Sequence, residues 1–199
     1  MGSENLPHKS SAATAADGKS AVRIFVALKI TPDIANQLAQ LARGLERFPV
    51  RFIAPKDIHL TLVPPWHEAS LPTAVEKLRN VAEKAAPFSL SFVSLTYGPQ
   101  PRRARLLWAE CAAGEELTTL RTALLLAFGQ VDDRPFRPHV TLARIRGYGA
   151  AVARKHPMDR APTIAVQQVE TVELMQSPPA GEVGYRVLAS MRLGREPMR

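Results

Sequence analysis

The chain has 199 residues, a net charge of +8 and an isoelectric point near 10.1, and 46% of its residues are hydrophobic. This size and composition suit one globular domain with a real core, and no apolar run approaches the roughly 20 residues of a membrane helix. The single cysteine, Cys111, excludes an internal disulfide framework. We therefore expect a cytoplasmic monomer that does not bind membranes, and the positive charge favours an anionic partner.

Residues 1–20 are polar and rich in Ala and Ser, and they lack the apolar centre of a signal peptide. A segment of this composition cannot bury enough apolar surface to order itself, so we predict a disordered N-terminal tail. The remaining residues, 21–199, are predicted to form one domain.

The first half of the chain alternates β-rich segments with segments of helical periodicity. Thr31-Pro32 supplies an N-cap and a first-turn proline for a helix. Pro64-Pro65 is expected to end a strand, because neither proline can donate a hydrogen bond to a neighbouring strand. The predicted order is a strand over 23–30, a helix from 31, a short strand over 50–53, a strand over 58–63 and a helix from 70.

The second half repeats this order. Apolar residues at helical spacing from Leu117 to Phe128 are followed by Gly129, which suits the left-handed conformation at a helix C-terminus. Trp108 precedes the histidine at 139 by 31 positions, and Leu28 precedes the histidine at 59 by the same number. Strands are predicted over 88–95, 106–111, 137–143, 166–175 and 185–193. We therefore predict an α+β fold of two pseudo-symmetric lobes, each a mainly antiparallel sheet with helices outside.

One four-residue pattern occurs twice, as His-Leu-Thr-Leu at 59–62 and as His-Val-Thr-Leu at 139–142, 80 positions later. Side chains two apart in a strand point the same way, so each copy places an imidazole and a hydroxyl on one face. An imidazole transfers protons near neutral pH, and a hydroxyl donates a hydrogen bond to a phosphoryl oxygen. If the two strands meet at a cleft, they supply an acid, a base and two hydroxyls for phosphodiester cleavage without a metal.

Positive charge is concentrated around the second copy of the pattern rather than spread evenly along the chain. This crowding favours a polyanionic substrate such as RNA over a small neutral molecule. The residues concerned are Arg102, Arg103, Arg105, Arg134, Arg137, Arg144, Arg146, Arg154, Lys155 and Arg160.

On these residues the chain resembles the 2H phosphoesterase superfamily, and within it the RNA 2′,3′-cyclic phosphodiesterases, also called 2′-5′ RNA ligases. The resemblance covers about residues 22–194 and implies their bilobal fold. In place of the Lys-Phe-Leu-Gly that follows the first motif in many members, this chain has Val-Pro-Pro-Trp-His at 63–67. The sequence therefore leaves two roles open for Trp66, stacking on a base or filling the junction of the lobes. The segments that carry the resemblance are 23–28, 59–62, 133–144, 173–177 and 184–185.

The resemblance implies hydrolysis of the 2′,3′-cyclic phosphate ends of RNA to 2′-phosphomonoesters together with reversible 2′-5′ RNA ligation, and it implies no metal or other cofactor. It makes His59 the proton donor, His139 the proton acceptor, and Thr61 and Thr141 the phosphate ligands. Arg144 matches a family arginine near the phosphate. Strict alternation would turn Arg144 to the opposite face, so it needs a strand end or a β-bulge to reach inward.

The sequence alone does not exclude other functions. An RNA-end binding module could keep the cleft without turnover, although binding alone needs no matched acid and base. A metallohydrolase could use His59 and His139 as ligands, although only Asp57 shares a face with His59 and the chain has no HExxH cluster. Among related enzymes, a 2′-5′ oligonucleotide phosphodiesterase and a small cyclic-nucleotide hydrolase are alternatives.

Overall fold

The structure is a computed structural model that describes residues 21–158, 166–179 and 181–194, so the predicted tail and Arg160 lie outside the described residues. The helices are α1 (Pro32–Ala42), α2 (Leu71–Ala82), α3 (Glu115–Phe128) and α4 (Gly149–Lys155), and the 3₁₀ turns are η1 (Arg43–Leu45), η2 (Pro55–Asp57) and η3 (Pro101–Arg103). The strands are β1 (Val22–Lys29), β2 (Val50–Phe52), β3 (His59–Glu68), β4 (Phe88–Gly98), β5 (Leu106–Cys111), β6 (His139–Ile145), β7 (Val166–Val169), β8 (Thr171–Gln176) and β9 (Arg186–Arg192).

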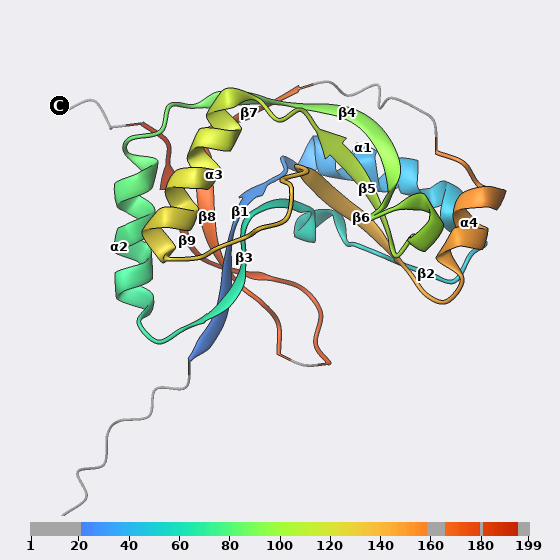
Figure 1. The fold of residues 1–199 in the computed structure, drawn as a ribbon, viewed down its shortest axis with the longest axis horizontal. Helices are drawn as coiled ribbons and strands as arrows, with labels where there is room; N and C mark the ends of the chain where they lie inside the picture. The colour runs from blue at the N-terminus through green and yellow to red at the C-terminus, as the bar shows by residue number, and fades with distance from the viewer. Residues whose placement is uncertain (1–20, 159–165, 180, 195–199) are drawn as a thin grey trace, which may run out of the picture.

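In this part of the chain, nine strands form one sheet with the order β7-β4-β5-β6-β3-β1-β8-β9, and β2 pairs with β6. Every pairing in it is antiparallel. The sheet curves into two lobes that meet where β3 lies beside β6 (Figure 1). The predicted α+β fold with antiparallel lobes is therefore confirmed.

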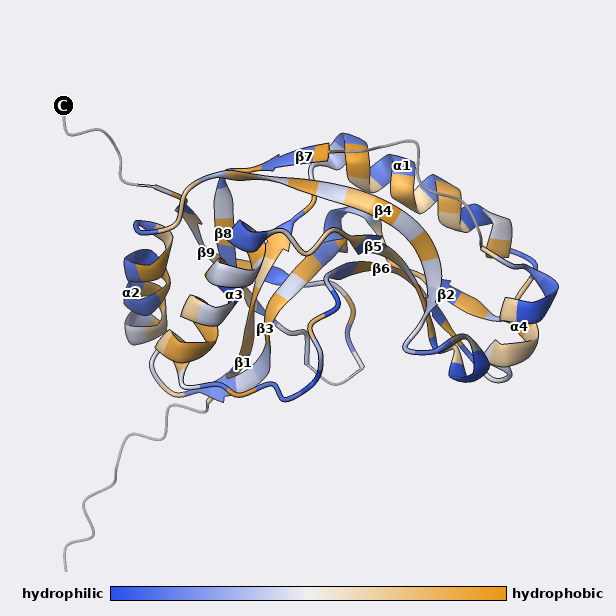
Figure 2. Ribbon diagram, turned by 45° about the horizontal axis from the view of Figure 1, so that its top comes forward, coloured by the Kyte–Doolittle hydropathy of each residue, from blue (hydrophilic) through white to orange (hydrophobic). Residues whose placement is uncertain are grey.

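Two helices, α1 and α3, each pack on the lobe that holds the motif strand of the other half of the chain. α2 and α3 cover the lobe of β3, β1, β8 and β9, whereas α1 and α4 lie with the lobe of β4, β5, β6 and β2 (Figure 1). The first-half helix α1 thus packs near the second motif strand, and α3 packs on the first. Hydrophobic and hydrophilic residues alternate along β3 and β4 (Figure 2). One face of the sheet is consequently buried against helices, and the other is left for polar side chains.

The prediction that Pro64-Pro65 ends a strand is wrong, because β3 runs through both prolines to Glu68. Two features of the strand pairing explain why the prolines can lie within β3. Ile24 pairs with Trp66 and Val26 with Val63, so the register shifts opposite the prolines and they need not donate to an even ladder. On its other side, β3 pairs with β6 only at Leu60. This stretch of β3 therefore makes no ladder with β6 that a proline could interrupt.

The strand predicted over 166–175 is two strands with different partners. β7 pairs with β4 and β8 pairs with β1. The chain passes from one lobe to the other at Glu170, whose carbonyl accepts a hydrogen bond from the Leu193 amide at 2.7 Å. A continuous β-rich sequence cannot reveal such a change of partner, because both strands have the same residue preferences.

Trp66 lies with the core and does not line the cavity that holds the two motifs. Its ring packs against Phe128 of α3 at 4.9 Å, and its Nε1 donates to the Glu68 carboxylate at 3.1 Å. Both partners of this contact belong to the lobe of β3, so Trp66 packs on α3 within that lobe, which is neither stacking on a base nor filling the junction of the lobes. Among the described helices, none is long and apolar enough to cross a membrane.

η3 and α4 pack against each other very closely at Gly149. A Cβ added at Gly149 would lie 1.7 Å from the carbonyl oxygen of Ala104, a backbone atom that cannot move aside as a side chain can. α4 was not predicted from the sequence, since its seven residues are too few for a clear helical period. Its position depends on this close approach.

We therefore expect Gly149→Ala to lower the free energy of unfolding by about 1–3 kcal/mol, the usual cost of overpacking a tight site. Urea denaturation followed by circular dichroism measures the change. Gly114→Ala gives a comparison without a steric clash, because its new Cβ would meet only Glu116 Oε2 at an ordinary 3.5 Å and its cost would come from the changed N-cap of α3. Wild-type stability of Gly149→Ala would show that the contact between η3 and α4 is not tight.

Candidate active site

The two motifs come together because their strands are neighbours. β3 and β6 are antiparallel and pair at Leu60 and Val140, the residues between the histidine and the threonine of each motif. Both aliphatic side chains are fully buried on the helix side, so the polar residues of the motifs face the other way. The sequence prediction that the two motif strands meet is confirmed.

The four polar motif residues line one cavity of about 380 Å³. Arg144 lines it as well, so all five residues predicted for the site lie together. Other lining residues were not predicted for the site, and they come from β1, β2 and the segments before β3 and β9. Among them are Arg23, Phe25, Arg51, Asp57 and Tyr185.

Arg144 reaches the cavity because β6 contains a β-bulge. Trp108 of β5 pairs with Thr141 and Leu107 pairs with Ala143, which leaves Leu142 as an extra residue. Leu142 and Ala143 are consecutive buried residues, so the alternation shifts by one position. The Arg144 side chain therefore lies on the open face of the sheet, where the cavity is. β3 has the same shift at its Leu62, where Ala27 pairs with Thr61 and Val26 with Val63.

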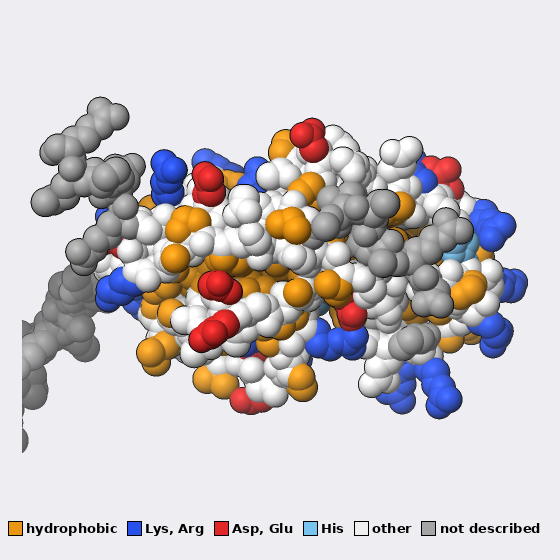
Figure 3. Space-filling view, turned by 90° about the horizontal axis from the view of Figure 1, so that it is seen from above, with side chains coloured by type: hydrophobic (Ala, Val, Ile, Leu, Met, Phe, Trp, Pro, Cys, Tyr) orange, Lys and Arg blue, Asp and Glu red, His pale blue; other side chains and the backbone are white. Residues whose placement is uncertain are grey.

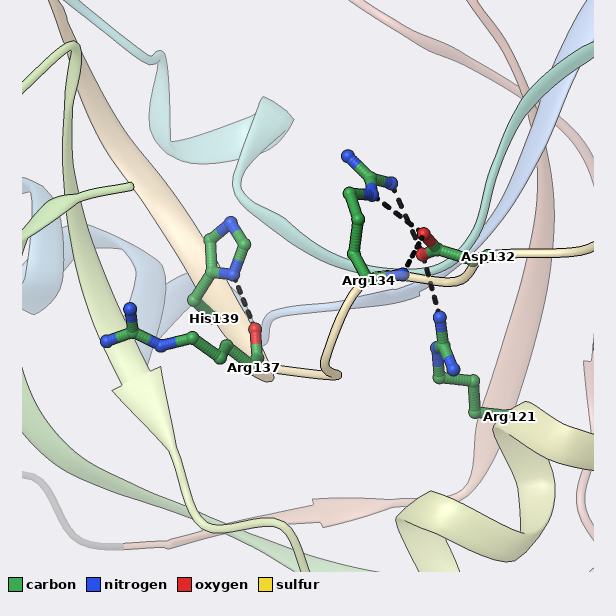
Figure 4. Close-up of polar contacts among 5 residues, drawn as sticks. All are labelled: Arg121, Asp132, Arg134, Arg137 and His139. Carbon is green, nitrogen blue, oxygen red and sulfur yellow. Dashed lines mark hydrogen bonds and ion pairs between the residues drawn. The ribbon is translucent and has the colours of Figure 1, made fainter. Parts of the chain in front are cut away.

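Each histidine is anchored by the carbonyl oxygen two residues before it. Nδ1 of His59 donates to the Asp57 carbonyl at 2.7 Å, and Nδ1 of His139 donates to the Arg137 carbonyl at 2.7 Å. A carbonyl oxygen can only accept, so Nδ1 carries the proton in both rings. Nε2 is then the atom left to exchange a proton, and for His139 this nitrogen points away from Arg137 (Figure 4).

Aromatic rings hold the two imidazoles in different ways. His59 lies 5.0 Å from the ring of Phe25 and 4.7 Å from that of Tyr185, whereas His139 lies 4.0 Å from Trp108. The 31-residue spacing predicted that Trp108 corresponds to Leu28, but Leu28 pairs with Leu60. Ala27, which pairs with Thr61, has the position equivalent to Trp108. Phe25 and Tyr185 therefore contact His59 where the small Ala27 cannot.

The segment before β6 is held by ion pairs. Asp132 accepts from Arg121 of α3 at 2.8 Å and from Arg134 at 2.7 Å (Figure 4). Arg137 forms an ion pair with Glu110 of β5, and its guanidinium lies 5.4 Å from the ring centre of Trp108. These contacts fix the backbone whose carbonyl anchors His139.

The two histidines have different electrostatic surroundings. Burial lowers the pKa of both below its ordinary value, because an imidazolium loses hydration there. The Asp57 carboxylate opposes this lowering of the pKa at His59, and the Arg137 guanidinium adds to it at His139. Glu110 partly offsets Arg137 at His139. The negative neighbour of one histidine and the positive neighbour of the other thus occupy equivalent positions.

Asp57 also connects the site to the segment before β9. Its carboxylate accepts a hydrogen bond from the Tyr185 amide at 3.3 Å, and Tyr185 packs edge-on against the ring of His59. The sequence signal for Asp57 was its position two residues before a motif histidine, which placed it on the same face.

Among the described residues, no group of three or more His, Cys, Asp or Glu side chains is placed to hold a metal ion.

Comparison with known proteins places this geometry in a family. Residues 53–151 match the model of the 2′-5′ RNA ligase superfamily. The RNA 2′,3′-cyclic phosphodiesterase of Bacillus subtilis (strain 168) is 32% identical over 129 residues, which are 60% of this chain and 69% of that protein. A protein of the same name from Methanothermobacter thermautotrophicus is 26% identical over 133 residues, 63% of this chain and 72% of that protein.

Solved structures share the fold. The Thermus thermophilus protein TT0787 has a TM-score of 0.69 and 26% identity, covering 87% of this chain and all of that one. Escherichia coli LigT complexed with 3′-AMP has a TM-score of 0.70 and 22% identity, covering 88% of this chain and all of that one. With its paired motifs in one cavity, this chain belongs to the 2′-5′ RNA ligase superfamily.

Proposed function

We propose that this protein hydrolyses the 2′,3′-cyclic phosphate end of RNA to a 2′-phosphomonoester. The observation that carries the proposal is the meeting of two histidines, two threonines and Arg144 in one cavity, with Nδ1 of each histidine bound to a carbonyl. Relatives named RNA 2′,3′-cyclic phosphodiesterase support the substrate. A site built only to bind an RNA end would not need two Nε2 atoms held ready for proton transfer.

In the proposed reaction, Nε2 of neutral His139 takes a proton from water as its oxygen forms a bond to phosphorus. The bond from phosphorus to O3′ breaks, and Nε2 of protonated His59 donates its proton to that oxygen. The product keeps the phosphate on O2′. Thr61, Thr141 and Arg144 donate hydrogen bonds to the non-bridging oxygens, whose negative charge grows in the transition state. With a 5′-hydroxyl in place of the attacking water, the same step makes a 2′-5′ linkage, because the 5′ oxygen bonds to phosphorus while the bond to O3′ breaks and His59 protonates O3′.

The charges beside the histidines support these roles. The Asp57 carboxylate favours a protonated His59, which is the form an acid needs, and the Arg137 guanidinium favours a neutral His139, which is the form a base needs. Burial disfavours the charged form of both rings. The negative charge of a bound phosphate offsets part of that cost at the acid.

Removal of either histidine is expected to abolish most of the activity. His59→Ala and His139→Ala should each lower kcat by about 10²–10⁴-fold on 2′,3′-cyclic AMP, and the double variant should be little worse, because the two proton transfers belong to one step. The assay is run in EDTA, and His67→Ala, at an exposed position of β3, is the control. Near-full turnover by His59→Ala would contradict the mechanism, and activity that zinc restores after EDTA would indicate a metallohydrolase.

The dependence of kcat/KM on pH should be bell-shaped, with both midpoints below about 6.5, because burial lowers the pKa of both histidines. Asp57→Asn removes a negative charge beside the acid, so the pKa of His59 falls and the descending limb moves to lower pH. Arg137→Gln removes a positive charge beside the base, so the pKa of His139 rises and the ascending limb moves to higher pH.

Steady-state kinetics across pH 4–9 (a range of about 2.5 units either side of the ordinary histidine pKa) measures both limbs. Lys84→Gln, a charge change at an exposed position after α2, is the control and should move neither limb. If Asp57→Asn moved the ascending limb instead, the acid and base roles would be reversed.

The identity of the product tests where the acid lies. Water must enter opposite the bond that breaks, so the ribose oxygen nearest His59 becomes the leaving alcohol. We expect this oxygen to be O3′ and the product on 2′,3′-cyclic AMP to be the 2′-phosphate. Phosphorus NMR of the reaction distinguishes the two isomers, with synthetic 2′-AMP and 3′-AMP as standards. A predominant 3′-phosphate would contradict this orientation, although it would leave the two-histidine chemistry intact.

A further inference from the structure

One end of the molecule carries a group of exposed basic side chains that the proposed reaction does not use. We call this group the basic corner, and its members are Arg102 and Arg103 of η3, Arg146 after β6, and Arg154 and Lys155 of α4. All five are exposed. Lys and Arg side chains gather at the end of the molecule where α4 lies (Figure 3).

The basic corner differs from Arg121, Arg134 and Arg137 in its acidic surroundings among the described residues. Arg121, Arg134 and Arg137 form ion pairs with Asp132 or Glu110. Within the described part of the chain, no member of the basic corner forms an ion pair. Like charges held close together repel one another, so this arrangement is most favourable when an anion occupies it.

The backbone holds the basic corner in place. Gly149 at the start of α4 abuts Ala104 at the end of η3. The Tyr97 hydroxyl of β4 donates to the carbonyl of His156, just after α4, at 2.6 Å, and the Ile145 amide of β6 donates to the Arg105 carbonyl at 2.8 Å. η3, α4 and the end of β6 are thus joined, and their charges keep a fixed arrangement.

A row of arginines connects the catalytic cavity with the basic corner. Arg144 lines the cavity, and Arg51 of β2 pairs directly with it and lines the cavity too. Arg146 follows two residues after Arg144, just past the end of β6, where its amide donates to the Pro49 carbonyl beside β2 at 2.9 Å. Tyr148, the next large side chain before α4, is 90% exposed, so its ring is available for stacking.

We propose that the basic corner binds the phosphodiester backbone of the RNA strand on the 5′ side of its cyclic phosphate end, with Tyr148 stacking on a base. This inference rests on the proposed function and extends it from the reacting phosphate to the body of the RNA. Unpaired arginines neutralise successive phosphates and release their counterions, and an exposed aromatic ring stacks on any base. A membrane or an acidic protein would also bind positive charge, but the row of arginines into the cavity favours a strand whose end reacts there.

The test compares a substrate that reaches the basic corner with one that does not. The substrates are an RNA of about ten nucleotides with a 2′,3′-cyclic phosphate end, several phosphates long as a salt-dependent interaction requires, and 2′,3′-cyclic AMP. The variants are Arg102→Gln with Arg103→Gln, and Arg154→Gln with Lys155→Gln. For each phosphate that is no longer neutralised, KM for the RNA should rise about fivefold at about 0.1 M salt, and the slope of log affinity against log salt should become shallower by about 0.7. kcat/KM for 2′,3′-cyclic AMP should not change.

Lys77→Gln with Lys84→Gln is the matched control, because it removes the same charge at the α2 end of the molecule (Figure 1), where neither lysine forms an ion pair with a described residue. Tyr148→Ala should raise KM for the RNA without changing the salt slope, since stacking releases no counterions. Fluorescence anisotropy of a labelled RNA with a 3′-phosphate end measures binding without turnover. This readout tests the basic corner even if the wild-type protein hydrolyses neither substrate, a result that would overturn the proposed function alone.

Three outcomes would overturn the inference. Wild-type RNA affinity in both double variants would show that the basic corner does not bind RNA, and an equal loss of affinity in the α2 control would show that only net charge matters. Unchanged RNA binding together with weakened binding to phosphatidylserine vesicles would assign the surface to membranes.

Discussion

The pairing of β3 with β6 at Leu60 and Val140 is the contact on which the catalytic arrangement depends. Each of these buried residues lies between the histidine and the threonine of its motif, so the two motifs flank the pair on the open face of the sheet. Both strands gain one residue just after the threonine, at Leu62 and Leu142, and in β6 this bulge brings Arg144 into the cavity. The distance between the imidazoles is therefore set by backbone hydrogen bonds and core packing rather than by flexible loops.

The acid and base roles that we propose for the two motif histidines depend on their surroundings. Both histidines donate from Nδ1 to the carbonyl two residues earlier, and burial lowers the pKa of both. The side chains on those anchoring residues differ, a carboxylate at Asp57 and a guanidinium at Arg137. Opposite charges at equivalent positions favour opposite protonation states. A nearly symmetric backbone thus supports the asymmetric reaction that we propose, and the rings of Phe25, Tyr185 and Trp108 contact the imidazoles.

Local patterns in the sequence determined the elements and the chemical groups. Alternation and helical periodicity predicted most strands and α1 to α3, and the repeated His-x-Thr-Leu pattern predicted the four polar residues that face one cavity. These features depend only on residues close in the chain, so a sequence records them directly. The sequence indicated that Arg144 needs a strand end or a β-bulge to reach the cavity, but it did not predict that β6 contains the bulge.

Only the tertiary structure decided which segments became neighbours. It placed α1 and α3 on opposite halves from their own motif strands, split residues 166–176 between two lobes, and kept β3 continuous through its prolines. It also brought Trp108 to His139 and Tyr185 to His59. These outcomes depend on strand partners and register, which arise from packing between residues far apart in the chain. Residue preferences alone carry no record of such contacts, because a strand has the same composition whichever strand lies beside it.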